Sequence, residues 1–274
     1  MSNVKPEIAN QIMTGAFNTN YHDQGEGYPV MLLHGSGPGV TAWANWRLVI
    51  PELAKNRRVI APDLVGFGYT ERPENPEYNM TNWTQQVIDF MDALKLEKVD
   101  LVGNSFGGGL AIKLAIEYPE RIRRIVLMGS MGISFPITQG LDDVWGYTPS
   151  FENMKKMINL FAYNKEIVTD NLINMRFEAS IEPGFQESFS AMFPAPRQNG
   201  VESMASDEEK ISKITQPTLI VHGREDQVIP LDNAFRLMSL IDDAQLHVFG
   251  HCGHWTQIEQ TGRFCKLVED FLAE

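Results

Sequence analysis

The side chains best suited to chemistry in this sequence are a serine, an acid and a histidine, each placed just after a predicted strand. Ser105 stands in the pentapeptide Gly103-Asn104-Ser105-Phe106-Gly107, with a glycine two residues before it and another two residues after it. Glycines at these positions allow a tight, strained turn that holds the hydroxyl clear of the backbone. A serine hydroxyl attacks a carbonyl carbon only when a base takes its proton, so the chain must also supply a base.

Three histidines near the end of the chain are candidates for that base. His247 alternates within a predicted strand at residues 246–249, His251 opens the following loop, and His254 lies deeper in the loop before a helix. We select His254 as the base and expect His251 to stabilise the loop. An imidazole in this role removes the serine proton and returns it later in the reaction.

The acid that would orient His254 follows a predicted strand at residues 218–222. Glu225 and Asp226 both lie just beyond the carboxyl end of this strand, where an α/β sheet places functional groups. With either acid the order along the chain is serine, acid, histidine. That order is typical of the α/β-hydrolase fold and differs from the chymotrypsin and subtilisin orders.

A second glycine-rich loop, His34-Gly35-Ser36-Gly37-Pro38-Gly39, follows an apolar strand at residues 30–33. Its three glycines let backbone amides approach a ligand, and in this fold the position supplies an N–H group to the oxyanion hole. A phosphate-binding loop is the alternative, but no G-K-[ST] sequence follows. We expect His34 to anchor the loop rather than to act in catalysis.

The elements that position these loops alternate between strand and helix. Ser105 lies between a strand at 99–102 and a helix at 108–117, and two strands near the start, 16–21 and 30–34, are separated by hairpin-like turn residues at 23–27. Further strands are predicted at 59–62 and 125–129, and a helix at 81–94. This alternation predicts an α/β fold with a mostly parallel sheet covered by helices on both faces.

Residues 132–205 differ in character from the rest of the chain. They hold 12 of its 28 Phe and Met residues and interrupt the alternation between two core strands. We interpret them as a helical lid, between a first core part at 1–131 and a second at 206–274. Within the lid, Arg176 has no acidic residue three or four positions away, so it is free for a substrate carboxylate, a salt bridge elsewhere or a snorkelling position.

The overall composition argues against several classes of binding partner. A formal net charge of −12 argues against binding to nucleic acid or to an anionic membrane surface. Cys252 and Cys265 have no metal-type spacing and suggest reduced thiols in the cytoplasm. Neither a signal-peptide h-region nor an apolar run near 18 residues is present, so we expect a protein without a membrane partner.

With these residues in view, the whole chain resembles the meta-cleavage product hydrolases, the C–C bond hydrolases of bacterial aromatic degradation. The turn at 227–230 resembles the family's turn after the acid, which favours Asp226 over Glu225. Asn104 distinguishes this family from simple esterases, which more often have histidine before the serine (G-H-S). The resemblance is carried by HGSGPG (34–39), WANWR (43–47), GNSFGGG (103–109), VWGYTPS (144–150), HGREDQVIP (222–230) and HVFGHCGHWTQIEQ (247–260).

The resemblance implies roles for further residues and a substrate class. The backbone amides of Ser36 and Phe106 match the oxyanion hole, although several relatives have glycine in place of Ser36. The implied substrate is a small anionic 2-hydroxy-6-oxo-2,4-dienoate, cleaved without a cofactor or metal to 2-hydroxypenta-2,4-dienoate and a small acid, by a homodimer. Substrate-binding positions are matched by Asn45, Asn104, Arg176 and Trp255.

The size of the acid that is released is a separate expectation. Met131, Leu141, Trp145 and Val228 are expected to crowd the acyl side of the site, which favours hydrogen or methyl at C6 over phenyl. The rival functions are a general carboxylesterase, a cofactor-free haloperoxidase-like enzyme or lyase, and a ligand-binding receptor on the same scaffold. Dehalogenases and epoxide hydrolases are disfavoured because they have an aspartate in place of Ser105.

Overall fold

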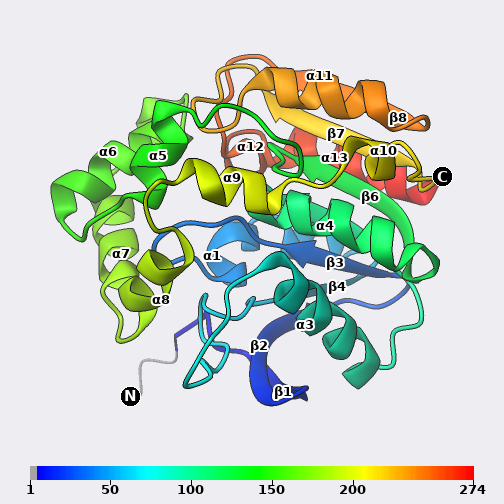
Figure 1. The fold of residues 1–274 in the computed structure, drawn as a ribbon, viewed down its shortest axis with the longest axis horizontal. Coiled ribbons are helices and arrows are strands. Elements are labelled where there is room, and N and C mark those ends of the chain that lie inside the picture. The colour runs from blue at the N-terminus through cyan, green and yellow to red at the C-terminus, as the bar shows by residue number, and fades with distance from the viewer. Residues whose placement is uncertain (1–4) are drawn as a thin grey trace.

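The strands form one eight-stranded sheet in the computed structural model, which describes residues 5–274 (Figure 1). The order across the sheet is β1-β2-β4-β3-β5-β6-β7-β8; β1 and β2 pair antiparallel, β2 and β4 pair antiparallel, and the remaining pairs are parallel. The strands are β1 (Asn10–Thr14), β2 (Phe17–Gln24), β3 (Pro29–Leu33), β4 (Arg58–Pro62), β5 (Val99–Asn104), β6 (Ile122–Met128), β7 (Thr218–Gly223) and β8 (Ala244–Phe249).

Helices cover both faces of this sheet, as predicted (Figure 1). On β3, Met31 and Leu33 pack into one hydrophobic core, whereas Val30 and Leu32 pack into the other. A strand that buries both faces is apolar throughout. The helices are α1 (Ala42–Trp46), α2 (Ile50–Leu53), α3 (Met80–Ala93), α4 (Phe106–Glu117), α5 (Gln139–Trp145), α6 (Phe151–Phe161), α7 (Asp170–Ser180), α8 (Phe185–Met192), α9 (Gln198–Met204), α10 (Glu208–Ile211), α11 (Leu231–Leu240), α12 (Thr256–Glu259) and α13 (Thr261–Ala273).

The predicted pairing of the first strands is wrong. β2 and β3 are not neighbours, because β2 pairs with β1 and β4, and β3 lies between β4 and β5. The physical reason is burial: the apolar β3 belongs in the middle of the sheet, whereas β2 carries polar residues and lies near the edge. The mostly exposed edge strand β1 was not predicted, since its sequence NQIMT is largely polar.

The helices α5 to α10 are inserted between β6 and β7; α5 to α8 lie together beside one end of the sheet, whereas α9 lies beside α4 (Figure 1). Three of these helices begin at a hydroxyl side chain that caps a free backbone N–H group: Thr138 accepts from Leu141 in α5, and Ser150 accepts from Asn153 in α6. Thr169 caps α7 in the same way. In the described part of the chain, no helix combines the length and the apolar character needed to cross a bilayer.

Candidate active site

Ser105 occupies a sharp turn between β5 and α4. Its φ of +52° is in the left-handed region, which is uncommon for a residue with a side chain, and its N–H donates to the Met128 carbonyl at 2.8 Å. The two glycines of the motif are required by packing. A Cβ at Gly103 would overlap the Gly107 carbonyl, and one at Gly107 would overlap the Leu33 carbonyl. The predicted strand-turn-helix geometry is therefore present.

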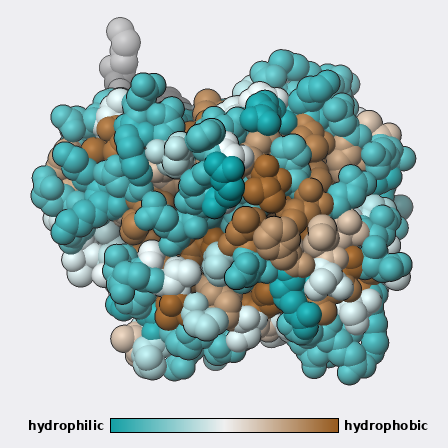
Figure 2. Space-filling model, turned by 90° about the horizontal axis from the view of Figure 1, so that it is seen from above, coloured by the Kyte–Doolittle hydropathy of each residue, from teal (hydrophilic) through white to brown (hydrophobic). Residues whose placement is uncertain are grey.

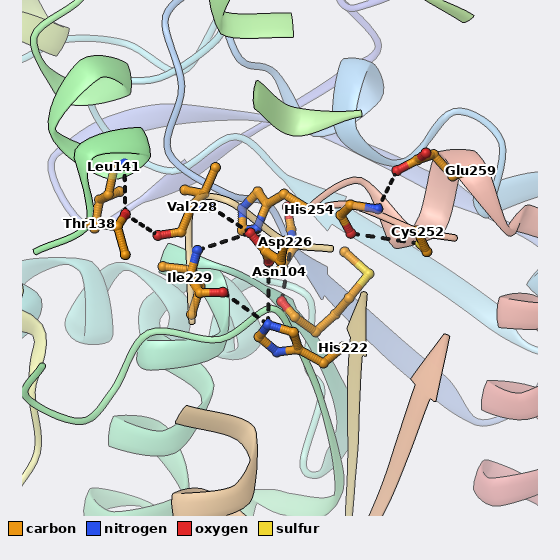
Figure 3. A network of polar contacts seen from close by, with 12 residues as sticks. Asn104, Thr138, Leu141, His222, Asp226, Val228, Ile229, Cys252, His254 and Glu259 are labelled. Atoms are coloured by element: carbon orange, nitrogen blue, oxygen red, sulfur yellow. Dashed lines mark hydrogen bonds and ion pairs between the residues drawn. The ribbon is translucent and has the colours of Figure 1, made fainter. Parts of the chain in front are cut away.

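Asp226 and His254 form a buried pair close to this turn (Figure 3). Asp226 Oδ2 accepts from His254 Nδ1 at 2.7 Å, and Asp226 Oδ1 accepts from the N–H groups of Val228 and Ile229 at 2.8 and 3.0 Å. Burial raises the pKa of Asp226, but the charge and hydrogen bond of His254 outweigh it, so the pKa is lowered. An ionised Asp226 fixes the proton on Nδ1 and leaves His254 Nε2 free to accept another.

Glu225 and His251, the alternative candidates for the acid and the base, form hydrogen bonds with other groups. Glu225 accepts from the Cys252 N–H at 2.9 Å and holds the loop before His254. His251 is exposed and lies 3.1 Å from the Tyr163 hydroxyl, so it connects that loop to the residues after α6. Only His254 among the candidate histidines therefore contacts an acid in a position to orient it.

A cavity of 390 Å³ lies beside Ser105 and His254, and both residues line it. It is also lined by the five other predicted residues Ser36, Asn45, Asn104, Arg176 and Trp255. Helices α6 and α7 contribute further lining, so the inserted helices form one wall. Among residues 5–274 no hydrogen bond joins the Ser105 hydroxyl to His254. Such bonds are often long before substrate binds.

His34 anchors the glycine-rich loop, as predicted. Its Nδ1 donates to the Gly35 carbonyl at 2.8 Å, and its Nε2 accepts from the Leu64 N–H at 3.0 Å, which defines a neutral ring. Asn45 Oδ1 accepts from the Gly35 N–H at 2.7 Å. The Ser36 hydroxyl accepts from Trp145 Nε1 at 3.1 Å, so this loop is also tied to the inserted helix α5.

Replacing His34 with glutamine is expected to reduce the loss in free energy of unfolding as the pH falls from 7 to 4. Burial lowers the pKa of His34 from 6.5 to about 4, so the folded protein binds fewer protons than the unfolded chain between these values. The wild type then loses about 3 kcal/mol of stability through this residue as pH falls from 7 to 4. Urea unfolding at several pH values measures the difference, with exposed His251→Gln as the control. Parallel profiles for His34→Gln and wild type would contradict the prediction.

Arg176 is buried without an acidic partner. Its side chain is 8% exposed and donates to the Pro38 carbonyl at 3.1 Å, and no carboxylate within residues 5–274 forms a salt bridge with it. Burial and the nearby charge of Arg47 lower its pKa to about 10, so the guanidinium remains charged at neutral pH. A buried cation facing a cavity is best compensated by an anionic ligand.

The residues expected on the acyl side do not line this cavity. Met131, Leu141, Trp145 and Val228 are each at most 2% exposed and pack into the hydrophobic core. Trp145 stacks on Phe193 with ring centroids 4.5 Å apart. The Met131 N–H donates to the Ser105 carbonyl at 3.1 Å, which attaches the Met131 backbone to the turn that carries the serine. The Phe106 side chain is also fully buried, away from the cavity.

Several polar residues of the site were missed by sequence reasoning. Arg47 lines the cavity, and only its place in the segment WANWR could have drawn attention to it. Gln257 lines the cavity fully buried, with its Oε1 unpartnered. His222 Nε2 donates to the Ile229 carbonyl at 3.0 Å and lies 3.5 Å from Asp226 Oδ2, so it supports the acid from behind. In the described residues, no group of three or more metal-binding side chains is assembled.

Comparison with known proteins agrees with this geometry. Residues 28–261 match a family described as the alpha/beta hydrolase fold. The chain is 60% identical to the 2-hydroxymuconate semialdehyde hydrolase of Pseudomonas sp. (strain CF600), over 98% of this chain and 95% of that protein. It is 56% identical to the 2-hydroxy-6-oxo-2,4-heptadienoate hydrolase of Pseudomonas putida (strain F1), over 100% and 99%. A solved structure of the meta-cleavage product hydrolase CumD from Pseudomonas fluorescens IP01, a serine-to-alanine mutant complexed with acetates, has a TM-score of 0.97 and 59% identity, covering 98% of this chain and 99% of that one.

Proposed function

Because the chain belongs to the meta-cleavage product hydrolases of the α/β-hydrolase fold, we propose that it hydrolyses the C–C bond between C5 and C6 of 2-hydroxy-6-oxo-2,4-dienoates. The observation that carries the proposal is the buried, acid-free Arg176 in the same cavity as Ser105 and His254. A general carboxylesterase needs the serine and the histidine but has no use for a buried cation. A dienoate brings the carboxylate that Arg176 lacks.

The reaction divides into proton transfer and cleavage. Arg176 and the two asparagines Asn45 and Asn104 hold the carboxylate end of the substrate, with Trp255 beside it. Conversion of the 2-hydroxy group to a ketone moves a proton to C5 and creates an electron sink at C2. When the C5–C6 bond later breaks, its electron pair moves into this sink and 2-hydroxypenta-2,4-dienoate is released.

The carbonyl at C6 is attacked with the help of His254. His254, oriented by Asp226, takes a proton from Ser105 or from a water molecule, and the attack turns the C6 carbonyl oxygen into an oxyanion. The N–H groups of Ser36 and Phe106 are the donors to this oxyanion. One such donor contributes about 3 kcal/mol in known acyl-transfer sites. When water attacks, C–C cleavage yields the small carboxylic acid directly. When Ser105 attacks, cleavage leaves an acyl group on its oxygen, and a water molecule then hydrolyses this ester to the acid.

The preferred C6 substituent is hydrogen or methyl. The support is the close packing of Met131, Leu141, Trp145 and Val228, which are each at most 2% exposed and do not line the cavity. A phenyl ring there requires displacement of buried side chains, and overpacking of this kind costs about 1–3 kcal/mol. The relatives named for the semialdehyde and the heptadienoate are consistent with this preference.

Replacing Met131 with alanine is expected to improve turnover of larger ketones. Met131 is buried and its backbone N–H donates to the Ser105 carbonyl, so truncating its side chain should open space for a bulkier acyl group. We expect kcat/KM for the phenyl ketone to rise about tenfold relative to the methyl ketone, which corresponds to about 1.4 kcal/mol. Steady-state kinetics with both ketones measures this ratio, and an unchanged ratio would remove Met131 from the acyl pocket.

Residues 132–205 act as a lid in this proposal, because Met157, Phe161, Leu172 and Met175 from α6 and α7 line the cavity. Phe161 stacks on His254 and on Trp255 with centroid distances of 5.7 and 5.0 Å. This contact couples the lid to the proposed base. A lid of this kind excludes water from the reacting carbon.

A cytoplasmic homodimer completes the proposal. It is supported by the two free, buried cysteines and by apolar residues on α11, where Phe235 and Met238 are 47% and 41% exposed next to the edge strand β8. Helix α11 lies at the top of Figure 1, and Figure 2 shows apolar side chains gathered on the face seen from above. Sedimentation equilibrium tests the dimer, and Phe235→Glu is expected to shift it to monomer.

Product analysis tests the function. Purified protein is mixed with 2-hydroxymuconate semialdehyde in oxygen-18-labelled water, and the products are identified by mass spectrometry. The proposal predicts equal amounts of 2-hydroxypenta-2,4-dienoate and formate, with the label in formate, because water supplies the new carboxyl oxygen. Unchanged substrate with an active esterase in the same sample would contradict it.

A further inference from the structure

The cavity beside Ser105 carries more positive charge than one carboxylate requires. Its lining includes two arginines, Arg47 and Arg176, and no aspartate or glutamate. The whole chain, by contrast, has 35 acidic and 23 basic residues. An acid-free cavity with two guanidinium groups, in so acidic a protein, indicates a ligand with more than one negative charge.

Arg47 has little to bind within the protein. It is half-buried at the end of α1, where its Nη1 donates to the Ala44 carbonyl at 3.1 Å. Within residues 5–274 it forms no salt bridge. Burial lowers the pKa of Arg47, and Glu7 raises it to a smaller extent. The remaining N–H groups of this guanidinium are therefore available to a ligand.

The two arginines lie close together in one wall of the cavity. The charge of Arg47 is the second cause, after burial, of the lowered pKa of Arg176. Both arginines also line a neighbouring cavity of 230 Å³. The acids Glu7, Glu178 and Glu182 line this second cavity as well. These three acids are absent from the lining of the cavity beside Ser105. Two neighbouring guanidinium groups repel each other, and an anion between them relieves the repulsion.

The position of Arg47 relative to Ser105 is fixed by the fold. Two residues earlier on α1, Asn45 Oδ1 accepts from the Gly35 N–H, so the helix is attached to the glycine-rich loop. Arg176 is attached to the same loop through the Pro38 carbonyl. Both arginines are therefore held against one loop, at the end of the cavity where the carboxylate end of the substrate belongs.

The substrate class has a second group that can become an anion. Its 2-hydroxyl is conjugated through the diene with the 6-oxo group, which makes it a vinylogous acid. Loss of this proton gives a dienolate with two negative charges, the carboxylate and the 2-oxido group. Resting on the proposed function, we propose that Arg47 binds the 2-oxido group while Arg176 binds the carboxylate, so that the site selects the dianion.

Ligand binding to a Ser105→Ala variant tests this role without turnover. The ligands are 2-hydroxy-6-oxohepta-2,4-dienoate and its analogue without the 2-hydroxyl, 6-oxohepta-2,4-dienoate, at a pH where the first is ionised. Adding Arg47→Gln is expected to weaken binding of the hydroxy compound by about 10- to 100-fold. Binding of the analogue should change less than about threefold, because its only charge is the carboxylate held by Arg176.

Two further variants and a spectrum make the test specific. Arg47→Lys keeps the charge and should restore part of the affinity, whereas Arg263→Gln removes an arginine outside the cavity and should change neither affinity. The visible band of the bound dienolate should decrease in Arg47→Gln, because the bound ligand retains its 2-hydroxyl proton.

Each other result overturns the inference in a recognisable way. Equal weakening for both ligands would mean that Arg47 binds the carboxylate, and no weakening would mean that it does not contact the ligand. If folded Ser105→Ala fails to bind either dienoate with Arg47 intact, the proposed function fails together with the inference. Circular dichroism and thermal unfolding establish folding for every variant.

Discussion

Replacing Ser105 with alanine is expected to lower kcat for dienoate hydrolysis by about 10³-fold or more, which is the loss seen when a member of a serine triad is removed. The Asp226 and His254 pair remains intact, but the hydroxyl that it activates is absent. Substrate binding should persist, since Arg176, Asn45 and Asn104 are unchanged. Stopped-flow absorbance gives the rate, and equilibrium titration gives the affinity.

The control for this prediction is Ser239→Ala, which changes an exposed serine on α11 that does not line the cavity. It should keep wild-type kinetics. The Ser105→Ala protein should also unfold within a few degrees of the wild type, because alanine occupies the same turn without a larger side chain. A Ser105→Ala rate within tenfold of wild type would remove this serine from the chemistry.

Replacing Arg176 with glutamine should lower kcat/KM for the dienoate by about 10²-fold or more, because a charge-assisted contact to the substrate carboxylate is lost. Hydrolysis of a neutral ester such as 4-nitrophenyl acetate should stay within a few-fold of wild type. Glutamine can still donate to the Pro38 carbonyl, so the glycine-rich loop keeps its attachment to α7. Parallel assays of both substrates separate the two effects.

The Arg176→Gln variant also distinguishes the proposed C–C hydrolase from a general carboxylesterase. A general esterase would lose activity on both substrates together, or on neither. Thermal unfolding provides the folding control: Arg176 is buried and forms no salt bridge within residues 5–274, so its removal should not destabilise the protein. Arg236→Gln on α11 offers a matched change of an exposed arginine outside the cavity.

The sequence predicted the site well where function follows directly from local order. Ser105, Asp226 and His254 each come just after a strand, and parallel strands bring their carboxyl ends to one edge of the sheet. Arg176 drew attention because no acidic residue lies one helical turn away, but its role as a substrate-binding residue was implied only by the family resemblance, which also favoured Asp226 over Glu225. These signals lie within a few residues of each side chain, so no knowledge of tertiary packing was needed.

Features that depend on distant packing were not predictable. The neighbours of β2 and β3 are set by competition among all strands for the centre of the sheet, and a turn between two strands does not decide it. Arg47 was missed because its exposure to the cavity depends on how α7 packs beside the glycine-rich loop. Met131, Leu141, Trp145 and Val228 were expected on the acyl side of the site, but the packed structure buries them in the hydrophobic core, outside the lining of the cavity.

The most direct test of the account is a comparison of three dienoates with the wild-type protein. The decay of dienolate absorbance is followed for 2-hydroxymuconate semialdehyde, its methyl ketone and its phenyl ketone at the same concentration. We predict fast decay for the first two and slow decay for the third, which would establish both C–C hydrolysis and a narrow acyl side. Absence of decay with all three substrates would contradict the assigned reaction and leave only the fold and the arrangement of Ser105, Asp226 and His254.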